Sequence, residues 1–172
     1  MPNHTEQQIS PYTPQQLFNL VADIEKYPVF LPWCRAARII EYSAIPAQAG
    51  ILDNNEKNFH LRGNDNREEF LGELIISFAH ITESYTSRVT LTPPQEDIAG
   101  SIDVVMVKGP FEHLTNHWKF TPTENGTIID FSLDFKFRSR ILEKLIGSLF
   151  TKANNKMVTA FKKRAEELYG NG

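Results

Sequence analysis

The longest regular pattern of apolar positions lies at the C-terminal end of the chain, from Ser139 to Tyr169. Apolar side chains recur there at helical spacing for about eight turns, and Gly170 follows as a stop signal. At 1.5 Å per residue, such a helix is roughly 45 Å long and crosses a whole small domain. The pattern therefore predicts one long amphipathic helix. Its apolar positions are Ile141, Leu142, Leu145, Ile146, Leu149, Phe150, Ala153, Met157, Phe161, Ala165 and Leu168.

Two shorter patterns near the N-terminus predict short helices. Thr13 followed by Pro14 is a favourable helix start, because the hydroxyl caps the first turn and proline lacks only an N–H that would be unpaired there. The apolar spacing that follows predicts a helix over residues 14–25. Residues 27–33 are also apolar, but two prolines limit them to a short helix or turn that docks onto a sheet. The face of the first helix is formed by Leu17, Leu20, Val21 and Ile24.

The middle of the chain alternates between apolar and polar positions, which is typical of strands with one buried face. The clearest case is the last strand, where Ile129, Phe131, Leu133, Phe135 and Phe137 alternate with polar residues. The aromatic side of this strand must be covered, and the long helix is the natural cover. The expected strands span residues 35–42, 69–80, 84–92, 100–108, 113–121 and 127–137.

One polar stretch, Ser43 to Arg67, interrupts these strands and is rich in Pro, Gly, Asn and Asp. A loop of this length is uncommon in a compact domain, so we interpret it as an insertion, with room for a short strand at Asn58 to Leu61.

The order of elements is a strand, two helices, a run of antiparallel strands and a long helix, which predicts an α+β fold with segregated elements. We expect a single domain over residues 1–172, in which a curved antiparallel sheet of about six or seven strands wraps around the C-terminal helix. One helix cannot fill a strongly curved sheet, so a tapered, ligand-sized cavity should remain. The chain has twelve phenylalanines, which either line this cavity or simply pack the core.

The composition points to an intracellular globular protein. Cys34 is the single cysteine, which excludes an internal disulfide framework and a cysteine-rich zinc site and suits a reducing compartment. Residues 1–10 are polar and do not resemble a signal peptide, and no apolar run is long enough to span a bilayer. A cytoplasmic location is therefore predicted.

The formal charge of −3 is unevenly distributed. Between Lys136 and Arg164 there are nine basic residues and one acid, a net charge of +8, which leaves −11 for the rest of the chain. This basic stretch is either an ordinary solvated helix face or a surface for an anionic partner such as lipid headgroups or RNA.

The sequence contains no constellation typical of catalysis or metal binding. His113 and His117 would lie about 13 Å apart along a strand, too far to share a metal ion. Asp130 and Asp134 belong to the polar face of their strand, and no partner base is evident for Cys34. No phosphate-binding glycine motif occurs, and the strand aromatics alternate with Asp and Ser rather than with basic residues. The sequence thus predicts no catalytic residue, no metal site and no DNA partner.

Three motifs resemble one family. The first runs from Leu17 to Cys34 (LFNLVADIEKYPVFLPWC), and the second is Gly109-Pro110-Phe111 followed by Leu114, Trp118 and Phe120. In the same order as in that family, the chain ends with Met157, Ala160, Phe161, Arg164, Ala165, Leu168, Tyr169 and Gly170. Together they resemble the coenzyme Q-binding and ribosome-association toxin family of the START-like (polyketide cyclase) superfamily. The resemblance covers nearly the whole chain and implies a helix-grip fold with a hydrophobic tunnel. The Ser43 to Arg67 stretch is longer than this family leads us to expect.

The resemblance implies a function of one of two kinds. One is a non-enzymatic carrier or chaperone for ubiquinone or a related polyprenyl lipid, which supports respiratory electron transport and quinone biosynthesis. The alternative is a toxin-like module that inhibits association of ribosomal subunits. The acidic net charge favours the lipid carrier, because tight RNA binding depends on phosphate neutralisation. A cavity enzyme of the polyketide cyclase type is a third hypothesis, supported only by analogy.

For the carrier we expect the lipid tail beside Phe131, Phe135, Phe150 and Met157, and the head near residues 109–114. Lys152, Lys156, Lys162 and Lys163 would contact an anionic partner, such as the inner face of the cytoplasmic membrane. No catalytic cofactor is expected. The full set of predicted cavity residues is Tyr27, Phe30, Leu31, Trp33, Phe111, Leu114, Trp118, Phe131, Phe135, Leu145, Phe150, Met157 and Phe161.

Overall fold

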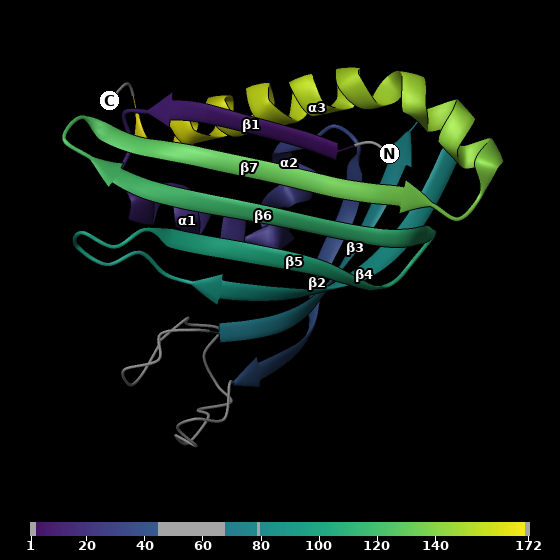
Figure 1. The fold of residues 1–172 in the computed structure, drawn as a ribbon, viewed down its shortest axis with the longest axis horizontal. Helices are drawn as coiled ribbons and strands as arrows, with labels where there is room; N and C mark the ends of the chain where they lie inside the picture. Colours follow the sequence, from purple (N-terminus) through teal and green to yellow (C-terminus); the bar gives the residue numbers. More distant parts are fainter. Residues whose placement is uncertain (1–2, 45–67, 79, 171–172) are drawn as a thin grey trace.

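A seven-stranded antiparallel sheet curves around one long helix in the computed structural model, which describes residues 3–44, 68–78 and 80–170 (Figure 1). The strand order is β1-β7-β6-β5-β4-β3-β2, so the N-terminal strand lies beside the last one. The predicted α+β helix-grip class is therefore confirmed. The strands are β1 (Asn3–Ser10), β2 (Cys34–Ala44), β3 (Glu68–Phe78), β4 (Ile81–Thr92), β5 (Gly100–Lys108), β6 (Phe111–Thr123) and β7 (Gly126–Phe137).

The first helix, α1 (Pro14–Ala22), begins as its sequence predicts. The Thr13 hydroxyl accepts a hydrogen bond from the Gln16 backbone N–H, and the Gln16 side chain accepts one from the Thr13 N–H, a reciprocal capping box. The helix ends earlier than the expected residue 25, because Asp23 leaves the helical conformation. A 3₁₀ turn (Ile24–Lys26) and the one-turn helix α2 (Tyr27–Phe30) follow.

The sheet matches the predicted strands closely, and the structure gives bounds to the expected first strand, the edge strand β1. This strand pairs with β7 over its whole length, from Asn3 opposite Asp134 to Ser10 opposite Thr127. Its side chains are mostly polar, and Ile9 is 79% exposed, so no hydrophobic alternation marks its bounds. Residues 45–67 of the predicted insertion, including the proposed strand at 58–61, lie outside the described residues.

The long helix α3 (Arg140–Tyr169) packs near both of its ends, with Ile146 buried in a cluster that includes Phe111 and Phe137. Phe161 and Ala165 are buried in the main core, and the Tyr169 hydroxyl donates to the Gln16 carbonyl at 2.9 Å. Ile141 and Leu145, expected on the buried face, are 71% and 52% exposed. At 3.6 residues per turn they lie nearly opposite Met157 and Phe161, so one helix face cannot bury both pairs. No helix among the described residues is long and apolar enough to cross a membrane.

Candidate functional site

An inner cavity of about 180 Å³ lies between the concave face of the sheet, α2 and α3. Its described walls come from the inward positions of β3 to β7 and from Ile146, Met157 and Phe161 of α3, and they are overwhelmingly apolar. Most of the residues predicted to line a cavity meet around it. These are Tyr27, Leu31, Trp33, Phe111, Leu114, Trp118, Phe131, Phe135, Met157 and Phe161.

Two predicted cavity residues, Phe30 and Leu145, lie elsewhere, and the prediction for Phe150 stays untested. Phe30 packs edge-on against Tyr27 and Phe161 and so supports the cavity wall from behind. Leu145 is more than half exposed on the outer side of α3 and lines neither this cavity nor its neighbour. The side chain of Phe150 lies outside the part of the chain that the structure describes.

An outer cavity of about 170 Å³ lies between β1 and the C-terminal half of α3. Four side chains, Trp118, Phe131, Met157 and Phe161, line both cavities and form a partition between them. The Trp118 ring lies 4.6 Å from that of Phe131 and 5.5 Å from that of Phe161, measured between ring centroids. Since these rings are in mutual contact, the two cavities are adjacent compartments of one interior.

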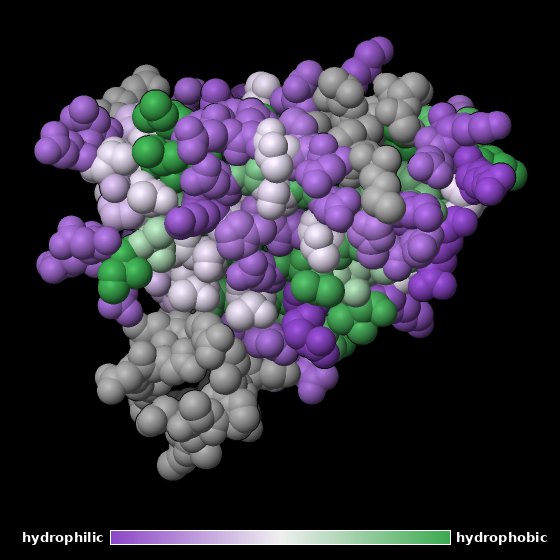
Figure 2. Space-filling model, viewed as in Figure 1, coloured by the Kyte–Doolittle hydropathy of each residue, from purple (hydrophilic) through white to green (hydrophobic). Residues whose placement is uncertain are grey.

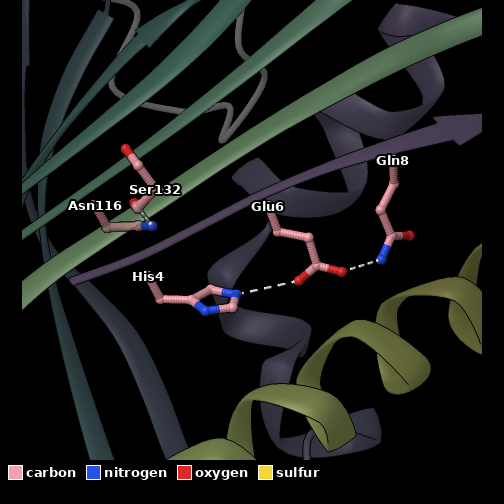
Figure 3. Close-up of polar contacts among 5 residues, drawn as sticks. All are labelled: His4, Glu6, Gln8, Asn116 and Ser132. Atoms are coloured by element: carbon pink, nitrogen blue, oxygen red, sulfur yellow. Dashed lines mark hydrogen bonds and ion pairs between the residues drawn. The ribbon is translucent and has the colours of Figure 1, made fainter. Parts of the chain in front are cut away.

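The rim of the outer cavity is polar (Figure 3). On β1, Glu6 accepts a hydrogen bond from Gln8 Nε2 at 2.5 Å and lies 3.3 Å from the Nε2 atom of His4. All three side chains occupy alternate positions of the strand, and they lie between β1 and α3. Lys162 and Glu166 face them from α3. The outer cavity therefore has a charged mouth, in contrast to the inner one.

Asn116 is the one amide in the described lining of the inner cavity, and its hydrogen bonds are internal. Its Nδ2 donates to the Ser132 carbonyl at 2.9 Å, and its Oδ1 accepts from the Trp118 indole N–H at 2.8 Å. The amide thus fixes the orientation of a partition residue. Sequence patterns did not single out Asn116, although its inward position on a strand follows from the alternation of Leu114, Asn116 and Trp118.

Two tyrosine hydroxyls of the inner cavity, and the Cys34 thiol next to the lining residue Trp33, are neutral at physiological pH. Burial raises the pKa of the Cys34 thiol to about 11, and it raises the pKa of the Tyr27 and Tyr85 hydroxyls well above their ordinary value. The Tyr27 hydroxyl donates to the Val21 carbonyl. Cys34 is therefore held as a thiol beside α2, the opposite of what a nucleophile needs.

This burial predicts a pH dependence of stability. The Cys34 pKa is higher in the folded protein than its ordinary 9.0, so the unfolded chain ionises first as the pH rises. The free energy of unfolding should then fall by roughly 1 to 2 kcal/mol between pH 9 and 11 from this thiol. Urea unfolding curves across that range measure it. Cys34→Ala is the control, because buried tyrosines add their own slope, and an identical slope in this variant would contradict the assignment.

The polar residues considered for metal binding lie on the outer face of the sheet. His117 Nδ1 contacts Asp103 at 2.5 Å, and His113 lies 3.5 Å from Asp134. Asp130 accepts a hydrogen bond from Gln7 at 2.7 Å. Each acid has its own partner, and no group of three or more metal-binding side chains occurs among the described residues.

Seven of the nine basic residues between Lys136 and Arg164 fall into two groups. Lys136 pairs with Glu112 at 3.0 Å, Arg138 donates to the Phe111 carbonyl, and Arg164 stacks on Phe30 and contacts Glu167. These three stabilise the fold. By contrast, the four lysines predicted to meet an anionic partner are all exposed on α3 and form no ion pair among the described residues: Lys152, Lys156, Lys162 and Lys163. We call these four the lysine face.

Residues 10–162 match the model of the polyketide cyclase/dehydrase and lipid transport family. The chain belongs to this family. The match confirms the resemblance predicted from the three motifs. A START superfamily protein from Mycobacterium smegmatis has the same fold, with a TM-score of 0.67 over 96% of this chain and 98% of the other. At 16% sequence identity that likeness concerns the fold alone.

Two curated relatives bear on the function of this family member. Ribosome association toxin RatA of Rickettsia prowazekii is 43% identical over 165 residues, which is 96% of this chain and 95% of the relative. A mitochondrial coenzyme Q-binding protein, COQ10 homolog B of Xenopus laevis, is 25% identical over 97% of this chain and 59% of its own length. The relatives therefore include both kinds of protein named in the predicted family, and this chain is more similar to the toxin than to the coenzyme Q-binding protein.

Proposed function

We propose that this protein is a ribosome-directed module that restrains the association of ribosomal subunits. The observation that carries the proposal is the 43% identity, over nearly the full length of both chains, to a ribosome association toxin. This reverses the preference drawn from the net charge, which favoured a lipid carrier. The activity would be exerted by binding in the cytoplasm, without catalysis.

The distribution of charge in the structure supports this revised preference. Net charge is an average over the surface, whereas RNA binding depends on local cations near phosphates. The lysine face is exposed on one helix, while several acids on the far side of the sheet are paired, among them Asp103 and Asp134. An acidic chain can therefore still present a basic surface to rRNA.

Co-sedimentation of the purified protein with ribosomal subunits tests the proposal. Binding should be clear at about 50 mM salt and much weaker at about 200 mM, because counterion release makes phosphate contacts salt-dependent. Absence of the protein from the ribosomal pellet at low salt would rule the proposal out. Flotation with anionic vesicles tests peripheral membrane contact, the other use that the sequence suggested for the lysine face.

A second function, binding of a hydrophobic ligand such as ubiquinone or a related polyprenyl lipid, is favoured by the inner cavity. Its walls are apolar, so burial of an apolar chain would drive affinity. A tail longer than the inner cavity would have to displace the partition and continue into the outer cavity. Organic extraction of the purified protein followed by mass spectrometry tests this, and recovery of no lipid from quinone-rich cells would contradict it.

A cyclase-type activity has less support. The described lining of the inner cavity contains no acidic, basic or histidine side chain, and its two tyrosine hydroxyls are neutral. General acid–base catalysis requires a group whose pKa lies near the working pH. The proposal is accordingly for a binding role rather than for catalysis.

A further inference from the structure

One polar group in the inner cavity has no hydrogen-bond partner among the described residues, the hydroxyl of Tyr85. The other polar groups of this lining are engaged: Tyr27 donates to Val21, and Asn116 bonds to Ser132 and Trp118. Tyr85 is half-buried and lines the inner cavity, so its hydroxyl is open to a molecule that enters there. A ligand oxygen can accept a hydrogen bond from it.

The position of Tyr85 is well defined. It occupies an inward position on β4, and its ring packs edge-on against Phe111 at 5.7 Å between centroids. Gly109 lies directly behind it, where an added Cβ would come within 2.6 Å of the Tyr85 Cβ. The glycine of the Gly109-Pro110-Phe111 motif therefore leaves room for this tyrosine. The hydroxyl is held near the segment where the sequence predicted a ligand head.

A second unpaired hydroxyl lies next along the same face of β4. Ser87 is 2% exposed, and its Oγ has no hydrogen-bond partner among the described residues. Residues two apart on a strand share a face and lie about 7 Å apart. Ser87 lies behind the described lining of the inner cavity, so Tyr85 carries the one hydroxyl of that lining without a hydrogen bond to another described residue.

The surroundings select against charge. No charged side chain belongs to the described lining of the inner cavity. Tyr85 is half-buried, and burial raises the pKa of its hydroxyl, which is therefore neutral at physiological pH. A ligand carboxylate or ammonium would be buried there without a counter-charge, which is strongly unfavourable, whereas a neutral carbonyl can accept the tyrosine proton.

We propose that the Tyr85 hydroxyl anchors an uncharged ligand that carries a carbonyl oxygen on an otherwise apolar skeleton. This inference rests on the hydrophobic-ligand function proposed above and is independent of ribosome binding. It adds the ligand class: neutral ketones, quinones and esters bind in the inner cavity, and free fatty acids are rejected. It also names the side chain that distinguishes them.

Displacement of the fluorescent probe N-phenylnaphthylamine by three ligands with nine carbons tests the proposal. These are methyl heptyl ketone, nonene and nonanoate, which share a skeleton but differ in the polar group. The wild-type protein should bind the ketone at least about tenfold more tightly than nonanoate at neutral pH. In Tyr85→Phe the ketone should bind about three- to tenfold more weakly, since one hydrogen bond is lost, while nonene should bind as before. Tyr42→Phe, on an exposed tyrosine, is the matched control and should change nothing.

The outcomes separate two kinds of failure. If the ketone binds Tyr85→Phe as tightly as the wild type, or if nonanoate matches the ketone, the Tyr85 anchor is wrong while the cavity remains a ligand site. If no ligand displaces the probe from the wild-type protein, the hydrophobic-ligand function fails together with the anchor. Near-ultraviolet circular dichroism verifies that Tyr85→Phe, which removes only one oxygen, is folded.

Discussion

Replacing Lys152, Lys156, Lys162 and Lys163 together by glutamine should weaken ribosome binding by about 100-fold at low salt. Each phosphate contact contributes a slope of about −0.9 to the dependence of log affinity on log salt concentration. Four such contacts account for roughly a 100-fold loss between about 50 and 200 mM salt, and neutralising the lysines removes this contribution. The four side chains are exposed on α3, so the substitution leaves the core intact. Sedimentation of the protein with ribosomal subunits over a salt series measures both the affinity and the slope.

The control variant loses the same number of positive charges as the lysine-face variant, but from surfaces outside α3. Lys26, Arg35, Lys108 and Lys119 are also exposed, and they lie outside α3. Replacing these four by glutamine lowers the net charge equally, yet it should reduce binding only slightly, because exposed charges beyond a Debye length are screened. An equal loss in both variants would mean that net charge, and not the lysine face, governs binding.

Phe120→Ala should destabilise the fold by about 3 to 5 kcal/mol. Phe120 is 0% exposed and lies between Phe18 of α1 and Trp118 of the partition, with ring centroids 6.2 Å from each. Its removal would leave a cavity in the main core and loosen a ring that separates the two cavities. The midpoint of urea unfolding, followed by circular dichroism, measures this loss. Val29→Ala, at a residue that is 66% exposed, should change stability by less than about 0.5 kcal/mol.

If Phe120→Ala and Val29→Ala proved equally stable, the interior would not be packed around Phe120. A hollow fold makes this comparison informative, because residues that line a cavity already lack neighbours on one side. Phe120 lines only the outer cavity and is otherwise enclosed, so its truncation should behave as a core substitution.

The sequence predicted the elements whose pattern is local and apolar. The alternation from Ile129 to Phe137 defined β7, and the helical spacing after Ser139 defined α3. The bounds of β1 could not be predicted in this way, because its polar side chains carry no hydrophobic signal and it is held by pairing with β7, more than a hundred residues later. Likewise, the apolar residues of α3 do not form a single stripe, and the spacing alone could not show that Ile141 and Leu145 lie nearly opposite the buried face.

The apolar part of the candidate site was predictable for the same reason, because apolar side chains form local patterns in the sequence. Aromatic and aliphatic residues on inward strand positions or in the family motifs, such as Phe131 and Trp118, were identified as cavity residues. Tyr85 and Asn116 were not identified as cavity residues, because the alternation of apolar side chains marks only apolar positions. The strand alternation that places Tyr85 and Ser87 inward was nevertheless available in the sequence. The preference for a lipid carrier is reversed by the greater similarity to a ribosome association toxin, and net charge was a weak guide because it does not show where the exposed lysines lie.

The most direct test of the central claim is a subunit-joining experiment. Separated bacterial ribosomal subunits are mixed under conditions that favour joining, with increasing amounts of this protein, and the products are resolved on a sucrose gradient. The ribosome-directed function predicts that joined ribosomes decrease with added protein while free subunits accumulate, and that the lysine-face variant has little effect. Unchanged joining at protein concentrations well above those of the subunits would contradict it.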